Sequence, residues 1–148
     1  MVIGMELTNT DRHTLSEAAR VLLVEDNEPL AEVTAEFLRN QGLEVQVAST
    51  GREALASVVT FGPDIVLCDL RLPDMTGFDI KNALRNSPVT KNALFVIHSA
   101  YSETDIDVDV SDGDLFLSKP LTPEKVERLL ELSRRPRPEG PTQPVWKE

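Results

Sequence analysis

The feature of this sequence that most limits its fold is a regular alternation between short apolar runs and longer segments with apolar residues at helical spacing. The apolar runs lie at residues 21–24, 45–47, 63–69, 94–97 and 114–118. They are too short for helices and rich in strand-forming residues. The segments with helical spacing lie at residues 29–40, 51–59, 78–85 and 123–132. Buried parallel strands covered on both faces by helices produce this alternation, so the sequence predicts an α/β fold with an open, doubly wound sheet of five parallel strands.

Length and charge narrow the class of protein further. The chain has 148 residues, 41% of them hydrophobic, which suits one domain with a proper core. It carries 15 Lys and Arg against 25 Asp and Glu, and a formal net charge of −10 disfavours binding to nucleic acid or to an anionic membrane. No apolar run approaches the length of a membrane-spanning helix, and the first residues lack a signal-peptide pattern. We therefore expect a cytoplasmic protein with no nucleic-acid or membrane partner.

Composition divides the chain into three parts. Residues 1–20 are mixed and polar, and we interpret them as an N-terminal extension. Residues 21–134 carry the alternation and form the predicted domain. Residues 135–148 are rich in proline and cannot continue a helix, so we expect a flexible tail. The tail holds the only tryptophan, Trp146, and a docking peptide is the alternative interpretation there.

Polar side chains follow the predicted strands at the point where each strand ends. In an open α/β sheet, ligands bind outside the carboxyl ends of the strands. The residues at those ends are Glu25, Asp26, Asp69, Ser99, Lys119 and Pro120. Three carboxylates, a hydroxyl and an ammonium group should therefore meet at one edge of the sheet. Each of them alone is explained equally well as a solvated loop residue, but the set together is not.

The chemistry of this set points to a metal ion and a phosphoryl group. Close carboxylates repel one another, and a bound divalent cation relieves that repulsion. Mg²⁺ suits a site with few carboxylates, water molecules and a phosphate. A carboxylate can attack a phosphoryl group to form an acyl phosphate, while a metal and a lysine neutralise charge on the transferring oxygens. We predict that Asp69 is the nucleophile and that Glu25 and Asp26 hold the metal.

Short motifs around these residues resemble the response regulator receiver domain of two-component signalling. They are Val-Glu-Asp at 24–26, Asp-Leu-Arg-Leu-Pro-Asp-Met-Thr-Gly at 69–77, Ser-Ala at 99–100 and Lys-Pro at 119–120. The spacings of 43 residues from Asp26 to Asp69 and 30 from Asp69 to Ser99 are also similar to those of the family. The resemblance covers about residues 21–134 and implies a flavodoxin-like sheet with the strand order 2-1-3-4-5.

The resemblance also implies roles for the acidic residues. Asp69 would accept a phosphoryl group from a histidine kinase or a histidine phosphotransfer protein. Asp26 and Asp69 would ligate Mg²⁺ together with the backbone carbonyl of Arg71. Glu25 would act on the metal partly through water.

A second group of residues is implied to bind the phosphoryl group and report its arrival. Ser99 would hydrogen-bond one phosphoryl oxygen, and Lys119 would pair with another. The bond between Lys119 and Pro120 would be cis, which aims the lysine into the pocket. Phe116 would swing inward when the loop of Ser99 moves.

Two features depart from the family pattern or compete with it. Residues 101–113, where the family has its fourth helix, alternate aspartate with β-branched residues, so we expect this helix to be short, irregular or mobile. Cys68 and His98 invite interpretation as a catalytic dyad. Each directly precedes a pocket residue, and alternation along a strand turns it to the opposite face. We therefore expect both side chains to pack beneath helices.

We interpret the chain as a stand-alone receiver with no attached DNA-binding or enzymatic output domain. It would be a phosphorylation-controlled switch, and it would catalyse only its own phosphorylation and dephosphorylation. Its signal would leave by protein contact, either by relay of the phosphoryl group to a histidine phosphotransfer protein or by altered binding of a downstream target, and a homodimer is a further possible partner. One alternative is a receiver-shaped interaction module that never accepts phosphate. The other is a Mg²⁺-dependent phosphohydrolase acting through an aspartyl phosphate, although such enzymes typically need a second acid where this chain has Arg71.

Overall fold

The computed structural model of the chain describes residues 18–99 and 115–134, and within them five parallel strands form one sheet in the order β2-β1-β3-β4-β5. The strands are β1 (Arg20–Val24), β2 (Glu44–Ala48), β3 (Ile65–Cys68), β4 (Leu94–Ser99) and β5 (Leu115–Ser118). The helices are α2 (Glu28–Asn40), α3 (Gly51–Phe61), α4 (Gly77–Arg85) and α5 (Pro123–Arg134). The predicted α/β class and the flavodoxin-like strand order are confirmed. Three predictions fall outside the described residues. They concern the short or irregular helix expected at residues 101–113, the N-terminal extension up to residue 17 and the tail at residues 135–148.

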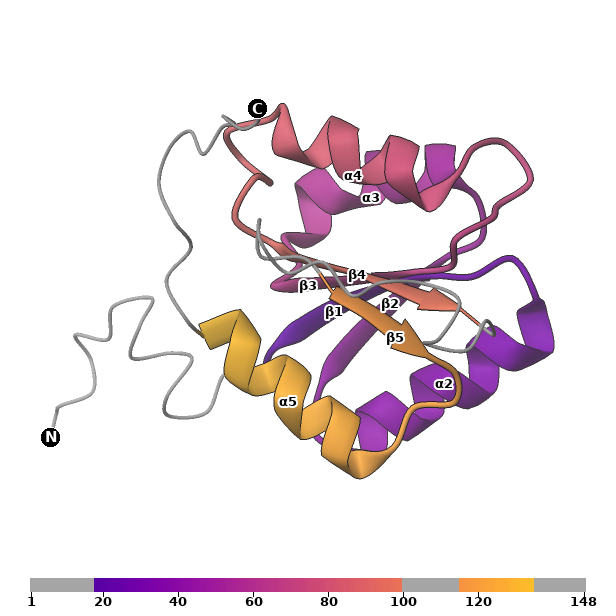
Figure 1. Cartoon of the computed structure of the whole chain (residues 1–148), viewed down its shortest axis with the longest axis vertical. Coiled ribbons are helices and arrows are strands. Elements are labelled where there is room, and N and C mark those ends of the chain that lie inside the picture. The colour runs from indigo at the N-terminus through magenta and orange to yellow at the C-terminus, as the bar shows by residue number, and fades with distance from the viewer. Residues whose placement is uncertain (1–17, 100–114, 135–148) are drawn as a thin grey trace, which may run out of the picture.

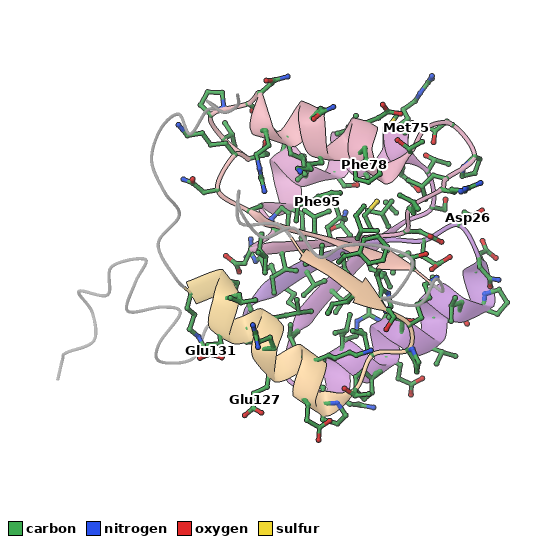
Figure 2. The ribbon with its side chains drawn as sticks, viewed as in Figure 1. Asp26, Met75, Phe78, Phe95, Glu127 and Glu131 are labelled. Carbon is green, nitrogen blue, oxygen red and sulfur yellow. The ribbon has the colours of Figure 1, made fainter. Side chains whose placement is uncertain are left out.

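Helices cover both faces of the sheet (Figure 1). On one side lie α3 and α4, and on the other lie α2 and α5. Successive residues of each strand enter opposite layers, as the pleat of a strand requires. Leu22 and Phe95 pack in the layer under α3 and α4, whereas Leu23 and Val96 pack in the layer under α2 and α5. Figure 2 shows Phe95 between the sheet and the upper pair of helices. All four residues are at least 98% buried, so the strands are fixed from both sides.

Side-chain caps set the first residue of three helices. Asn27 Oδ1 accepts a hydrogen bond of 3.0 Å from the N–H of Leu30, and Thr50 caps α3 in the same way. Thr76 and Asp79 form a reciprocal capping box at the start of α4. Such caps satisfy backbone N–H groups that have no partner within the helix. Because Asn27 directly follows Glu25 and Asp26, its cap also fixes where the acidic loop after β1 ends.

The start of β1 differs slightly from the sequence prediction. The strand begins at Arg20 rather than at Val21, because Arg20 is held by tertiary partners. Its backbone N–H donates to Asp64 Oδ2 at 2.9 Å, and its guanidinium donates to the carbonyl of Phe61 at the same distance. A charged residue can therefore be the first residue of a strand whose other residues are all apolar. Among residues 18–99 and 115–134, none of the helices has the length and apolar character that crossing a bilayer requires.

Candidate functional site

Three carboxylates gather at the carboxyl ends of the neighbouring strands β1 and β3, in the interior of the sheet. Glu25, Asp26 and Asp69 each offer one oxygen, and these oxygens all lie within 4.8 Å of one another. Glu25 is buried, Asp69 is partly buried and Asp26 is exposed. In Figure 2, Asp26 lies at the end of the sheet, beside the start of α2. We call these three residues the acidic pocket.

Backbone hydrogen bonds that continue the sheet hold the pocket in place. The N–H of Glu25 donates to the carbonyl of Ala48 at 2.9 Å, and the N–H of Asp69 donates to the carbonyl of Val24 at 3.0 Å. The carboxylate of Glu25 also accepts a hydrogen bond of 3.2 Å from the N–H of Asn27. Two of the three acids are thus fixed by the strands themselves rather than by a free loop, which keeps the carboxylates together despite their repulsion.

Lys119 provides the positive charge of the site. Its Nζ lies 2.8 Å from Glu25 Oε1 and 3.5 Å from Asp69 Oδ2. The side chain is only 16% exposed, so the ammonium group is directed into the site rather than into solvent. Its backbone N–H donates to the carbonyl of Ser99 at 2.7 Å, which joins the ends of β4 and β5. The peptide bond between Lys119 and Pro120 is cis, as predicted.

Three further predicted residues lie at the end of β4, within β5 and in the loop after β3. Ser99 is buried and ends β4. Phe116 lies opposite Ile97 in the pairing of β4 with β5, and it packs in the layer under α3 and α4. Arg71 is exposed, and it forms an isolated antiparallel bridge with Thr76 that closes the loop after Asp69. The phosphoryl-binding, metal-binding and switching roles of these residues stay predictions.

Gly77 is a positioning residue that the sequence analysis did not single out. A Cβ at this position would lie 2.9 Å from the backbone carbonyl oxygen of Asp69 and 2.6 Å from Cδ1 of Ile97. The N–H of Gly77 also donates to the carbonyl of Leu70 at 2.7 Å. The first residue of α4 must therefore be glycine if the helix is to start directly against the backbone of Asp69. The motif at 69–77 contains this glycine, but the sequence does not indicate that its Cα lies against the carbonyl oxygen of Asp69.

Asp74 ties the loop after Asp69 to a second helix. Its two carboxylate oxygens accept hydrogen bonds from the N–H groups of Gly51 and Arg52, at 2.8 and 2.9 Å. These bonds, that of Gly51 first, lower the pKa of the Asp74 carboxyl below its usual value of 3.8. A carboxylate at a helix N-terminus is favoured by the orphan N–H groups and by the helix dipole. Asp74 thus anchors the loop that carries Arg71 to the start of α3.

Cys68 and His98 do not form a dyad, as the strand alternation predicts. Cys68 packs among the core residues under α3 and α4, whereas His98 belongs to the adjoining strand and lines a surface beside α2. Burial, and then the charges of Asp69 and Glu25, raises the pKa of the Cys68 thiol well above its ordinary range. Both side chains lie beneath helices, as their position in the strand alternation indicates.

The donor set of the acidic pocket fits a hard divalent cation. Carboxylate oxygens are the ligands that Mg²⁺ prefers in proteins, and Mg²⁺ typically uses one or two carboxylates together with water and phosphate oxygens. The nearby ammonium group of Lys119 suits a negatively charged ligand. The geometry therefore supports a site that binds a metal ion and a phosphoryl group side by side.

Comparison with known proteins agrees with this geometry. The family model of the response regulator receiver domain matches residues 21–131. The chain belongs to the response regulator receiver family. The receiver is 38% identical over 131 residues to the alkaline phosphatase synthesis transcriptional regulatory protein SphR of Synechococcus elongatus, covering 81% of this chain and 51% of that protein. It is 35% identical over 117 residues to the transcriptional regulatory protein TrcR of Mycobacterium tuberculosis, covering 78% of this chain and 46% of that protein. The receiver therefore spans about half the length of these two regulators.

Solved structures give the same result for the fold. The receiver superimposes with a TM-score of 0.69 on a CheY-like receiver domain from Methylobacillus flagellatus, at 30% identity, covering 79% of this chain and 99% of the other. The chemotaxis response regulator CheY4 of Vibrio cholerae gives a TM-score of 0.66 at 28% identity, covering 78% of this chain and 98% of the other. These likenesses establish a signalling module of two-component systems. Receiver domains bind Mg²⁺ through an acidic pocket of the kind that Glu25, Asp26 and Asp69 form here.

Proposed function

We propose that this receiver is a phosphoacceptor switch in which Asp69 takes a phosphoryl group from the phosphohistidine of a kinase or phosphotransfer protein. The observation that carries the proposal is the position of Lys119, whose ammonium group lies within 3.5 Å of Asp69 Oδ2 while it pairs with Glu25. A lysine held there can meet the charge that develops on a phosphoryl group transferred to Asp69.

The transfer itself is a substitution at phosphorus. A carboxylate oxygen of Asp69 attacks, an O–P bond forms, and the N–P bond of the phosphohistidine breaks. The imidazole nitrogen leaves with the bonding electron pair and is free to take a proton from solvent. The partly buried setting of Asp69 limits the water that competes for the phosphoryl group.

The acidic pocket would hold Mg²⁺ during this reaction. Asp26 and Asp69 are the proposed direct ligands with the backbone carbonyl of Arg71, and Glu25 acts partly through water. The ion would supply positive charge that offsets the repulsion between the carboxylates and the incoming phosphoryl oxygens. Glu25 keeps Lys119 directed toward Asp69 through its 2.8 Å ion pair.

The output of the switch is proposed to be a change in protein contact. Ser99 would bind a phosphoryl oxygen, and Phe116 on the paired strand β5 would follow its movement. A downstream protein or a second copy of the chain would recognise the altered surface. We propose a cytoplasmic setting and no direct contact with nucleic acid, although two relatives are named as transcriptional regulatory proteins and are about twice as long. Among the contacts of residues 18–99 and 115–134, none favours the phosphohydrolase or the phosphate-independent module over this function.

Phosphorylation in vitro tests the proposal directly. The receiver is incubated with acetyl phosphate and Mg²⁺, and intact-protein mass spectrometry should show one added phosphate. No phosphate should be added when the metal is chelated before the phosphodonor is supplied. Asp69→Asn should show none. Glu127→Gln, on an exposed position of α5 far from the pocket (Figure 2), is the control and should be labelled like the wild type.

Two outcomes would contradict the proposed function. Equal labelling of wild type and Asp69→Asn would place the acceptor elsewhere, and no labelling of the wild type at saturating Mg²⁺ would favour the phosphate-independent module. Steady turnover of a phosphate ester would instead support the hydrolase.

A further inference from the structure

A second lysine, Lys125, binds the backbone of the turn that joins β5 to α5. Its Nζ donates to the carbonyl of Ser118 at 2.8 Å and to the carbonyl of Pro120 at 3.0 Å. It also lies 3.5 Å from Ser118 Oγ, so the three donors of the ammonium group face three oxygens of one turn. The two carbonyls belong to the residues on either side of Lys119, whose own ammonium group lies beside the acidic pocket. Lys125 therefore holds the backbone from which Lys119 extends.

The place of Lys125 in its helix is electrostatically unfavourable. It is the third residue of α5, and its N–H donates to Thr122 Oγ1 at 3.2 Å, as at a capped helix start. The N-terminus of a helix carries partial positive charge, which favours an acidic side chain over a lysine. Glutamate or glutamine is the usual residue three positions after a threonine cap. Sequences break such local rules mainly at functional sites, and here the side chain is used to bind the turn before the helix.

Lys119 and Lys125 carry like charges close to the same buried residue. Burial first, and then the charges of these two lysines, lower the pKa of His98. Neighbouring like charges repel, so each ammonium group needs its own acceptors to keep a fixed direction. Lys119 has carboxylate oxygens, at 2.8 Å in Glu25 and at 3.5 Å in Asp69. Lys125 has the carbonyl oxygens that flank Lys119, so its contacts fix the starting point of the Lys119 side chain.

We propose that Lys125 is a positioning residue for phosphoryl transfer to Asp69, and that it acts through Lys119 by holding the carbonyls on either side of it. The inference rests on the proposed function, in which Lys119 meets the charge on the phosphoryl group. Because the ammonium group of Lys119 stands at the end of a long flexible side chain, a small rotation of the turn moves it away from Asp69. A displacement of about 1 Å at a reacting centre can lower a rate about a hundredfold.

The kinetics of labelling test this role. The full receiver is mixed with acetyl phosphate and Mg²⁺ at a temperature where every variant is folded, and intact-protein mass spectrometry follows the initial rate of phosphate addition. Lys125→Met should lower this rate about tenfold. Lys125→Arg should recover most of it, because a guanidinium group can donate to both carbonyls. Arg128→Met is the matched control, since it removes an exposed positive charge from the same helix, and it should stay within about twofold of the wild type.

A double-mutant cycle shows whether Lys125 acts through Lys119. Lys119→Met should itself slow the labelling, and adding Lys125→Met to it should change the rate by less than about twofold. Two residues that act as one unit are not additive in their effects. An equal slowing by Lys125→Met with and without Lys119 would contradict the inference, because the effect would then not pass through that side chain.

The affinity for Mg²⁺, measured by NMR titration without a phosphodonor, separates repositioning from a general loss of structure. If the ammonium group of Lys119 leaves the carboxylates, the acidic pocket becomes more negative. Lys125→Met should therefore bind Mg²⁺ about threefold more tightly than Arg128→Met, although both variants lose one positive charge. A protein that is only less well folded would bind the ion more weakly.

Three results would overturn the inference. They are an unchanged labelling rate in Lys125→Met, an undiminished effect of that substitution in the Lys119→Met background, and weaker binding of Mg²⁺ by Lys125→Met. Failure of the proposed function has a different signature, because the wild type would then take up no phosphate at saturating Mg²⁺. Normal labelling of both the wild type and Lys125→Met refutes the role of Lys125 alone.

Discussion

Lys119 Nζ and Glu25 Oε1 lie 2.8 Å apart, and this ion pair joins the turn after β5 to the end of β1 across 94 positions of sequence. The side chains are only 16% and 5% exposed, so the pair is largely removed from water. Breaking such a pair by removing one partner leaves an uncompensated buried charge, which is much more costly than losing an exposed pair. Removing either partner should therefore destabilise the fold, and the contact orients the lysine.

Lys119→Met should lower the free energy of unfolding by about 3 kcal/mol, because it leaves Glu25 buried without its partner. Chemical denaturation measures this loss. Lys91→Met removes an exposed lysine and should stay within about 0.5 kcal/mol of the wild type. Added Mg²⁺ should recover part of the stability of Lys119→Met, because a cation in the acidic pocket replaces the missing positive charge. An unchanged stability of Lys119→Met would show that the ion pair contributes nothing.

Gly77→Ala should destabilise the receiver by about 1–3 kcal/mol, because the added Cβ meets the backbone carbonyl of Asp69, which cannot move cheaply. Gly51→Ala is the matched control. Both glycines are the first residue of a helix capped by threonine, but a Cβ at Gly51 meets only the flexible side chain of Met75. Gly51→Ala should therefore cost clearly less. Equal losses in thermal or urea unfolding would argue against a special fit at Gly77.

The anchoring of the loop by Asp74 should depend on pH. Its hydrogen bonds from Gly51 and Arg52 lower the pKa of the carboxyl below 3.8, so the folded state binds this proton less tightly than the unfolded chain does. The stabilisation is therefore present above the unfolded pKa and is lost as the pH falls through the lower folded value. Asp74→Ala should melt at a lower temperature than the wild type at neutral pH, and this difference should shrink in strong acid. Asp74→Asn, which keeps one acceptor oxygen, should lie between the two.

His98 should remain neutral under conditions that protonate an ordinary histidine. Its pKa is lowered from 6.5 to about 3, chiefly by burial and further by Lys119 and Lys125. The unfolded chain binds this proton more tightly, so the contribution of neutral His98 to stability is complete above pH 6.5 and declines as the pH falls toward 3. NMR of the imidazole resonances between neutral pH and about pH 4.5 tests the prediction. A midpoint for His98 near 6.5 would contradict it.

Urea unfolding supplies an independent check on the same group. The stability of His98→Leu should fall less steeply with acid than that of the wild type over this range, because the variant has no buried imidazole to protonate. Parallel acid profiles of the two proteins would show that His98 does not carry the effect.

The fold and the acidic pocket could be predicted from the sequence because both depend on periodic patterns. The apolar runs that end in Glu25, Asp69 and Ser99 give the strands, and parallel strands place their carboxyl ends on one edge. The motif around Asp69 also contains Gly77, but its role depends on a backbone oxygen that comes close only after α4 packs against β3. A glycine in a sequence does not show what lies opposite it.

Other features could not be predicted because they depend on contacts between distant segments. Arg20 opens β1 only because Asp64 and Phe61 hold it, and a charged residue otherwise argues against a buried strand. The strand alternation correctly predicted that the side chains of His98 and Ser99 point to opposite faces of the sheet. It did not indicate that Val33 and Phe37 line a groove together with His98. Such neighbours follow from helix packing, which periodicity alone does not specify.

The bond from the Lys119 N–H to the Ser99 carbonyl has a practical consequence for protein engineering. It holds the carboxyl ends of β4 and β5 in a fixed relative position. A design that moves this site into another parallel sheet must therefore keep both strand ends and their register. The relative placement of Ser99 and Lys119, which carry the hydroxyl and the ammonium group, is then set by the hydrogen bonding of the two strands.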